Sequence, residues 1–271
     1  GSEFEALTRV RAGDGVYPAV DELISLAGEV RTILGADTKI SYAANWSENA
    51  THVVDAEAKE VRFPLDPLWA NENIDFVGLD YYAPLSDWRE GNAHLDGAAH
   101  ESIYAPDYLR ANLRGGEAYD FYYVDDEARR AQARLPIVDG AFGKSWMFRA
   151  KDLWNWWGEP HYERVAGAEL GSATAWVPKS KPIRLTEVGC PATHFGSNQP
   201  NVFPDAKSSL GGVPHFSNGS RDDLIQRRYL EAVASMFDPA YGASESDNPI
   251  SPLYGGRMVD AQNIYAWAWD A

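Results

Sequence analysis

Two glutamates have the side chains and the setting for chemistry on a sugar. Glu187 closes the apolar run Pro182 to Glu187 (PIRLTE) and precedes Val188 and Gly189, while Glu3 follows Gly1 and Ser2. Cleavage of a glycosidic bond needs one carboxylic acid to protonate the leaving oxygen and one carboxylate to attack the anomeric carbon or activate water. We therefore consider the hypothesis that these two glutamates catalyse glycoside hydrolysis. The alternatives are a surface glutamate after a strand for Glu187, and a terminal or helix first-turn acid for Glu3.

Aromatic residues add to this hypothesis, because the faces of Trp and Tyr rings stack on the apolar faces of sugars. The chain has ten tryptophans. Four aromatic residues are expected at strand ends: Trp46, Tyr82, Trp267 and Trp269. Three more form a cluster near His161 in the sequence: Trp154, Trp156 and Trp157. Packing in the core is the alternative for each of them.

The sequence gives no metal or cofactor motif. His161 and His194 lack an HxH or HExxH spacing, so a structural role or a substrate contact is favoured over metal ligation. Cys190 is the single cysteine, which excludes an internal disulfide and a cysteine-based zinc site. We expect neither a metal nor a cofactor.

The elements that must position these residues alternate between strands and helices. Four short apolar segments are typical of strands: residues 39–46, 74–82, 182–187 and 263–270. Two longer segments, residues 20–34 and 221–237, have helical periodicity. This alternation favours a parallel α/β fold. In a barrel of that class, reacting groups lie at the carboxyl ends of the strands, where Glu187 is expected.

Residues 83–181 form a region far longer than an ordinary strand-to-helix connection. Residues 104–113 and 125–134 are helix candidates within it. The motif WNWWGEPHYER and the stretch from Gly189 to Gly219 are predicted to be loops, because glycine and proline interrupt them.

The charge of the chain excludes some partners. A formal charge of −16 argues against a nucleic-acid surface, which would need clustered Lys and Arg. No apolar run reaches the roughly 18 residues that a membrane-spanning helix needs, so we expect no membrane insertion.

Several motifs occur in an order that is typical of one known family. They are GSEFEALTRVR, KISYAANWSE, IDFVGLDYYAPLSDWREG, KPIRLTEVGCPA, NQPNVFPDAKSS, RDDLIQRRYLEA and YAWAWDA. On these motifs, which cover nearly the whole chain, the sequence resembles the TIM-barrel-like domain of gene transfer agents. That domain is part of a large tail-tip or baseplate protein of phage-like particles.

The same motifs are similar, more distantly, to clan A glycoside hydrolases, including retaining β-mannanases. That resemblance implies that Glu3 is the acid/base at the end of strand four and Glu187 the nucleophile at the end of strand seven. It implies that Tyr82, on strand six, donates a hydrogen bond to the nucleophile. The implied substrate contacts are Asn45, Trp46, Asp80, Trp157, His161, Trp267 and Trp269. Two departures stand out: Ser2 replaces the usual Asn before the acid/base, and the region after strand six is much longer.

The resemblance implies that residues 1–271 form one domain, the C-terminal part of a (β/α)8 TIM barrel. It would run from the end of strand four through strand eight, be truncated at its N-terminal side, and carry a long insertion at 83–181. We expect a retaining glycoside hydrolase that acts on a cell-envelope polysaccharide, within the virion tail and beside other tail or baseplate proteins. The alternative is a non-catalytic glycan-binding or structural tail domain.

Overall fold

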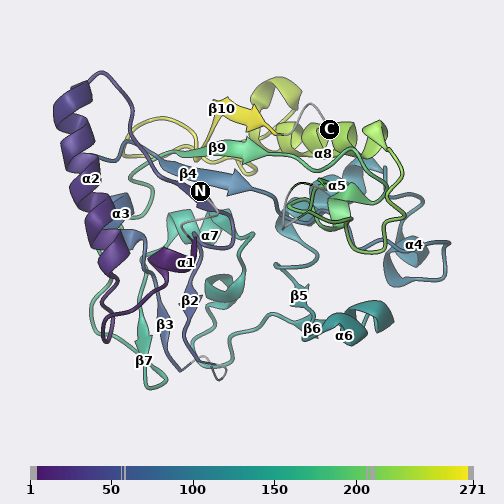
Figure 1. The fold of residues 1–271 in the computed structure, drawn as a ribbon, viewed down its shortest axis with the longest axis horizontal. Helices are drawn as coiled ribbons and strands as arrows, with labels where there is room; N and C mark the ends of the chain where they lie inside the picture. The colour runs from purple at the N-terminus through teal and green to yellow at the C-terminus, as the bar shows by residue number, and fades with distance from the viewer. Residues whose placement is uncertain (1–4, 56, 58, 206, 208–210, 268–271) are drawn as a thin grey trace. The chain divides into compact units, whose positions relative to one another are not determined.

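The computed structural model describes residues 5–55, 57, 59–205, 207 and 211–267. Figure 1 shows the helices and strands, coloured from purple at the N-terminus to yellow at the C-terminus. The chain divides into two compact units that are each discontinuous in sequence. Unit 1 comprises residues 1–80, 153–186 and 250–263, and unit 2 comprises residues 81–152, 187–249 and 264–271. Three strands begin with residues of unit 1 and end with residues of unit 2.

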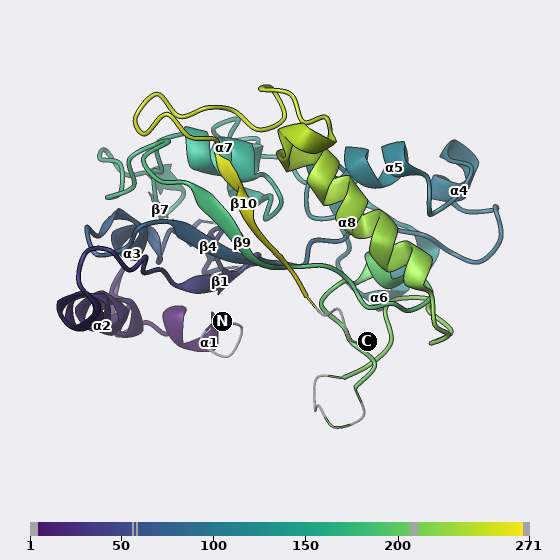
Figure 2. The same ribbon diagram turned by 90° about the horizontal axis from the view of Figure 1, so that it is seen from above.

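A four-stranded sheet in the order β1-β4-β9-β10 forms the centre of unit 1. Its strands are β1 (Ala43–Asn45), β4 (Val77–Tyr81), β9 (Ile183–Val188) and β10 (Val259–Ala266). Figure 2 shows the strands in this order, with β1 on the side of α1 and α2. β1 and β4 pair in parallel, with Asn45 opposite Asp80. All five residues of β4 are buried, as expected for a strand covered on both faces.

Gly78 shows why these strands approach so closely. A Cβ atom at Gly78 would lie 2.5 Å from the carbonyl oxygen of Tyr42, so only glycine fits there. All four predicted strands are present. The last one begins earlier than predicted, at Val259 instead of Asn263.

Helices and a second small sheet complete unit 1. The helices are α1 (Glu5–Thr8), α2 (Pro18–Leu34), α3 (Asp66–Ala70) and α7 (Leu153–Gly158). The second sheet has the order β2-β3-β7-β8, and its neighbouring strands pair antiparallel. Its strands are β2 (His52–Val53), β3 (Val61–Arg62), β7 (Arg164–Val165) and β8 (Ala168–Glu169). The prediction of a helix at 20–34 is confirmed. It begins slightly earlier, because Pro18 is favourable in the first turn.

The loop predicted at WNWWGEPHYER is wrong in its first half. α7 is a helix that buries Leu153, Trp154, Trp156 and Trp157. These four residues have helical spacing, and burial of their large apolar surface outweighs the nearby Gly158 and Pro160.

Unit 2 is built mainly from helices. They are α4 (Leu95–Ala99), α5 (Pro106–Ala111), α6 (Asp126–Ala131) and α8 (Asp223–Phe237), with 3-10 turns η2 (Asn112–Arg114), η3 (Ser145–Phe148), η4 (Gly196–Asn198) and η5 (Pro239–Tyr241). β5 (Phe121–Tyr122) and β6 (Leu135–Pro136) form an antiparallel pair. α8 packs beside α5 (Figures 1 and 2). The predicted helix at 221–237 is confirmed as α8, whose N-cap Asp222 accepts a hydrogen bond from the Ile225 amide.

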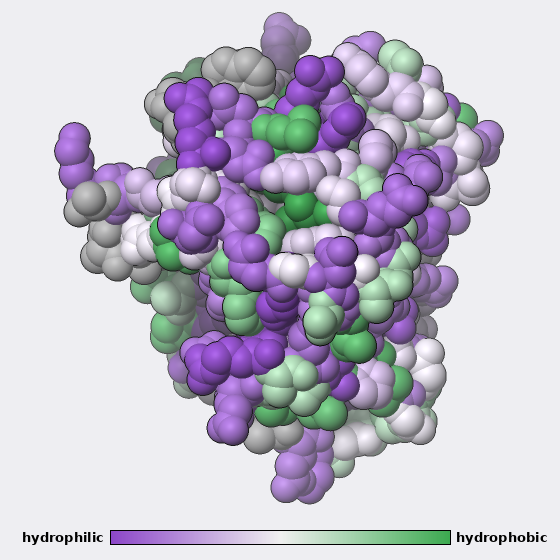
Figure 3. Space-filling view, turned by 90° about the vertical axis from the view of Figure 1, so that its right-hand side faces the viewer, coloured by the Kyte–Doolittle hydropathy of each residue, from purple (hydrophilic) through white to green (hydrophobic). Residues whose placement is uncertain are grey.

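The fold class is α/β, with parallel pairing at the predicted strands. The assignment of these strands to positions five to eight of a barrel stays a prediction. Figure 3 views the side on which α4, α5, α6 and α8 lie in Figure 1. Polar residues cover most of that face, and apolar residues form small separate groups. Among the residues that the structure describes, no helix is both long and apolar enough to span a membrane.

Candidate functional site

Tyr82 and Glu187 meet in unit 2. Tyr82 directly follows β4, and its hydroxyl donates a hydrogen bond of 2.6 Å to Oε2 of Glu187, near the end of β9. The predicted hydrogen bond is thereby confirmed. Tyr82 is buried, and its ring contacts that of Phe203 edge to face at 5.9 Å between centroids. Glu187 is half-buried, so its carboxylate combines a fixed orientation with access from solvent.

Buried side chains hold the backbone that follows Tyr82. The Tyr229 hydroxyl donates to the carbonyl oxygen of Ala83 at 2.7 Å, and Nζ of Lys151 donates to that of Pro84 at 2.6 Å. Tyr229 and Lys151 are both completely buried. Because two successive carbonyl groups are fixed in this way, the position of Tyr82 depends on the interior of unit 2.

Gly189, two residues after Glu187, lies against the backbone of Trp267. A Cβ atom at Gly189 would lie 2.0 Å from the carbonyl oxygen of Trp267, and the Trp267 amide donates to the Val188 carbonyl at 3.0 Å. Gly189 thus makes room for the backbone of residue 267. The Trp267 side chain is 55% exposed, which leaves its ring available to a ligand.

Three predicted substrate contacts lie together in unit 1. Asn45 stands opposite Asp80 in the parallel pair of β1 and β4, and the Trp46 amide donates to the Asp80 carbonyl at 3.1 Å. The Asp80 carboxylate is buried and accepts a hydrogen bond of 2.8 Å from the Thr186 hydroxyl. These residues share the carboxyl ends of neighbouring strands, which is where an α/β fold places functional groups.

Glu48 is an acidic residue that the sequence interpretation overlooked. It is buried, and its carboxylate accepts hydrogen bonds from the Thr8 hydroxyl (2.5 Å), the Tyr42 hydroxyl (2.9 Å) and the Asn45 amide (3.1 Å). Burial raises the pKa of Glu48, although the three hydrogen bonds act in the opposite direction. Its place in KISYAANWSE, shortly after a strand end, was the available signal. Glu48 fixes the turn that carries Asn45 and Trp46.

Trp157 and His161 do not have the exposure that a substrate contact needs. Trp157 is 1% exposed, and its Nε1 donates to the Lys181 carbonyl at 2.8 Å. His161 is completely buried, with Nδ1 at 2.8 Å from the Asp66 carboxylate and Nε2 at 2.7 Å from the Trp156 carbonyl. The prediction of sugar contacts by these two residues is therefore corrected: both lie in the core of unit 1.

Two predicted site residues, Glu3 and Trp269, lie outside the described residues. The separation of the two proposed catalytic carboxyl groups is thus a quantity for experiment. Within the described ranges, no group of three or more His, Cys, Asp and Glu side chains is arranged to hold a metal ion.

Strands that pair in parallel, with helices between them in sequence, define a protein of the α/β class. A comparison with protein families makes this more specific, because the model of the GTA TIM-barrel-like domain matches residues 1–271. The chain belongs to this family, that of the gene transfer agent TIM-barrel-like domain. A search of curated proteins gives no match.

Proposed function

We propose that this chain is a retaining glycoside hydrolase domain of a gene transfer agent tail protein, acting on a cell-envelope polysaccharide. The observation that carries the proposal is the 2.6 Å hydrogen bond between Tyr82 and Glu187 near the end of β9. A tyrosine that donates to a carboxylate stabilises the ionised form and fixes its direction. Those are the properties that a carboxylate nucleophile needs.

The proposed reaction has two steps. Glu187 attacks the anomeric carbon to form a glycosyl ester, while Glu3 donates its proton to the leaving glycosidic oxygen. Water then attacks the same carbon and loses a proton to Glu3, which releases the sugar and restores Glu187. Because Tyr82 engages Oε2 of Glu187, the other oxygen is the one that attacks.

Substrate binding is assigned to the strand ends. Asn45 would bind hydroxyl groups, whereas the predicted substrate contact of Asp80 is corrected, since Asp80 is buried and holds the Thr186 hydroxyl. The rings of Trp46, Trp267 and Trp269 would stack on sugars. The exposed side chain of Trp267 fits this role. The proposed partners are the polysaccharide and neighbouring tail or baseplate proteins, and the proposed location is the particle tail at the bacterial envelope.

The second candidate is a glycan-binding or structural tail domain without turnover. The exposed ring of Trp267 favours it, because stacking on a sugar requires no pair of acids. Both candidates place a polysaccharide at the same residues and differ in whether bonds are cleaved.

Release of new reducing ends from cell-wall and capsular glycans separates these candidates. The full parent protein should release them, and Glu187→Gln should lower the rate by at least about 10³-fold, as for loss of a catalytic nucleophile. Glu245→Gln removes a charge from an exposed position of unit 2 and should retain full activity. Glycan binding without release of reducing ends in the wild-type protein would establish the second candidate instead.

A further inference from the structure

Unit 2 contains a cavity that the proposed reaction does not use. Its volume is about 350 Å³, and it lies among the segment after β4, α4, α5 and β5. Its lining includes Pro84, Asp87, Leu95, Asp96, Tyr108, Glu117, Asp120, Phe121 and Arg134. This volume is at the lower end of the range for small-molecule sites.

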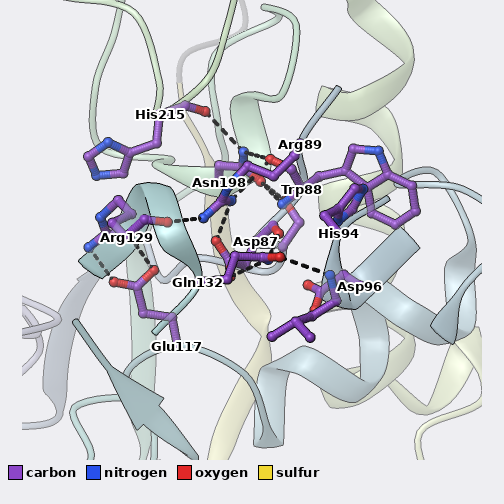
Figure 4. Close-up of polar contacts among 12 residues, drawn as sticks. Asp87, Trp88, Arg89, His94, Asp96, Glu117, Arg129, Gln132, Asn198 and His215 are labelled. Carbon is purple, nitrogen blue, oxygen red and sulfur yellow. Dashed lines mark hydrogen bonds and ion pairs between the residues drawn. The ribbon is translucent and has the colours of Figure 1, made fainter. Parts of the chain in front are cut away.

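The polar groups in the cavity wall are fixed by a buried network. Nη2 of Arg134 bridges the carboxylates of Asp87 and Asp96, at 2.7 and 2.5 Å. The Tyr108 hydroxyl donates to Asp96 at 2.5 Å and accepts from the Asp87 amide at 3.0 Å. Figure 4 shows Asp87 beside Gln132, whose side chain donates to it at 3.2 Å. Burial opposes ionisation of Asp87, but hydrogen bonds from Tyr123 and Arg134 lower its pKa overall. The wall is therefore preorganised and charged.

The charges at the cavity leave an excess of one carboxylate, because Arg89 and Arg134 pair with Asp87, Arg134 also pairs with Asp96, and Arg129 pairs with Glu117. The lining holds four carboxylates and a single guanidinium: Asp87, Asp96, Glu117, Asp120 and Arg134. Arg134 is already shared by two of these carboxylates.

The remaining two carboxylates differ in their partners. Glu117 forms a two-point ion pair with Arg129, at 2.6 and 2.7 Å (Figure 4). Asp120 accepts a hydrogen bond of 2.8 Å from the Gly116 amide and forms no ion pair with any described residue. The attraction of Lys151 reaches Asp120, but the Lys151 ammonium is completely buried and donates to the Pro84 carbonyl. Asp120 thus provides a carboxylate that a ligand can reach.

The other part of the lining is apolar and aromatic. Phe121, Pro84 and Leu95 contribute apolar surface next to these carboxylates. A purely apolar ligand would remove water from the carboxylates without replacing its hydrogen bonds. An anionic ligand would be repelled by the excess negative charge. A ring with hydroxyl groups on its edge and apolar faces matches both kinds of surface.

We propose that this cavity binds a single sugar ring and prefers one that bears a protonated amine, with Asp120 as the partner of the amine. Hydroxyl groups of the sugar donate to Asp96 and Glu117, and the exposed Leu95 side chain contacts its apolar face. This site goes beyond the proposed hydrolysis, since none of its lining residues takes part in that reaction. It provides unit 2 with a recognition site for amino sugars.

Calorimetric titration of the whole chain at pH 6 tests the proposal with glucosamine, glucose and glucuronic acid. Glucosamine should bind saturably and about tenfold more tightly than glucose, which corresponds to one ion pair of about 1.4 kcal/mol. Glucuronic acid should bind more weakly than either. Glucuronic acid affinity equal to that of glucosamine, or no saturable binding of glucosamine, would overturn the proposal.

Three variants locate the bound sugar. Asp120→Asn should remove the preference for glucosamine and retain glucose binding, whereas the matched control Glu245→Gln should change neither. Ala99→Trp fills the cavity without changing its charge and should abolish binding of both sugars. Glu187→Gln should bind glucosamine as the wild type does, so failure of the proposed hydrolysis leaves this test intact. Loss of binding in Glu187→Gln, with binding unchanged in Asp120→Asn, would place the sugar at Glu187 and refute the cavity site.

Discussion

Glu187 and Glu48 both lie near strand ends, but their surroundings differ. Glu187 is half-buried and accepts a hydrogen bond from the Tyr82 hydroxyl. Glu48 is buried and accepts three, from Thr8, Tyr42 and Asn45. A carboxylate surrounded by donors on both oxygens has its hydrogen-bonding capacity directed into the protein.

This difference separates a carboxylate that organises structure from one that is available for chemistry. Glu48 connects α1, the residue before β1 and the turn after β1, so its loss should affect folding. Glu187 is half-buried and accepts one hydrogen bond, so its loss should affect turnover far more than folding. A third ionisable residue, Lys151, is completely buried, and it holds the backbone that follows Tyr82 through the Pro84 carbonyl.

Lys151→Met should change the pH dependence of stability. Burial lowers the pKa of Lys151 from 10.5 to about 7, so the unfolded chain binds a proton between these values that the folded protein lacks. Stability due to this group therefore rises as pH increases from 7 to 10.5, and the burial penalty is fully present below pH 7. Relative to Lys151→Met, the wild type should gain about 4 kcal/mol between pH 7 and 10, at about 1.4 kcal/mol per pH unit.

Urea denaturation of both proteins from pH 6 to 10 measures this gain. The pKa of Lys181 is also lowered, by burial, to about 8, but this residue is present in both proteins and its contribution cancels in the difference. Parallel stability curves for the wild type and Lys151→Met would show that burial does not lower the pKa of Lys151.

Tyr82→Phe should reduce turnover on the order of 10²-fold, as for removal of one preorganised donor at a reacting centre. Folding stability should fall by only about 0.5 to 1.5 kcal/mol, because the Glu187 carboxylate can bind water instead. Initial rates of reducing-end release and thermal melting of the full parent protein measure the two effects.

Tyr81→Phe is the matched control. Tyr81 is completely buried, and its hydroxyl has no hydrogen-bond partner within the described part of the chain. Its removal should leave turnover unchanged and stability equal or slightly higher, since an unsatisfied buried hydroxyl is costly. Equal losses of turnover in both variants would mean that Tyr82 has no special relation to Glu187.

The regular elements were predictable because their apolar residues recur with clear periodicity. The spacing of apolar residues in 20–34 and 221–237 predicted α2 and α8, and short β-branched runs predicted β4 and β9. The periodicity of apolar residues did not predict the contact between Tyr82 and Glu187. These residues are far apart in sequence, and family resemblance supplied their pairing.

Burial explains the predictions that failed. Trp157 and His161 have side chains suited to sugar binding, but both are buried. The helical spacing of the apolar residues in α7 was an available signal for Trp157, whereas nothing in the local sequence shows that His161 is buried. Glu48 was overlooked for the opposite reason, because glutamate is rarely buried. Two of its donors, Tyr42 and Asn45, are local, but the third, Thr8, comes from α1 and lies 40 residues away in sequence. Such roles depend on tertiary contacts that a linear pattern does not encode.

Glu48→Ala should lower stability by about 2 kcal/mol, because the Thr8 and Tyr42 hydroxyls and the Asn45 amide lose their shared acceptor in a buried setting. Glu187→Ala is the matched control, and should lower stability by less, about 0.5 to 1.5 kcal/mol, because it removes a single hydrogen bond, the one from the Tyr82 hydroxyl. Urea denaturation at pH 7 compares the two variants directly. Because Glu48 orders the turn with Asn45 and Trp46, Glu48→Ala should also weaken glycan binding while Glu187→Ala retains it. A greater loss of stability in Glu187→Ala would reverse the roles that their hydrogen bonds indicate.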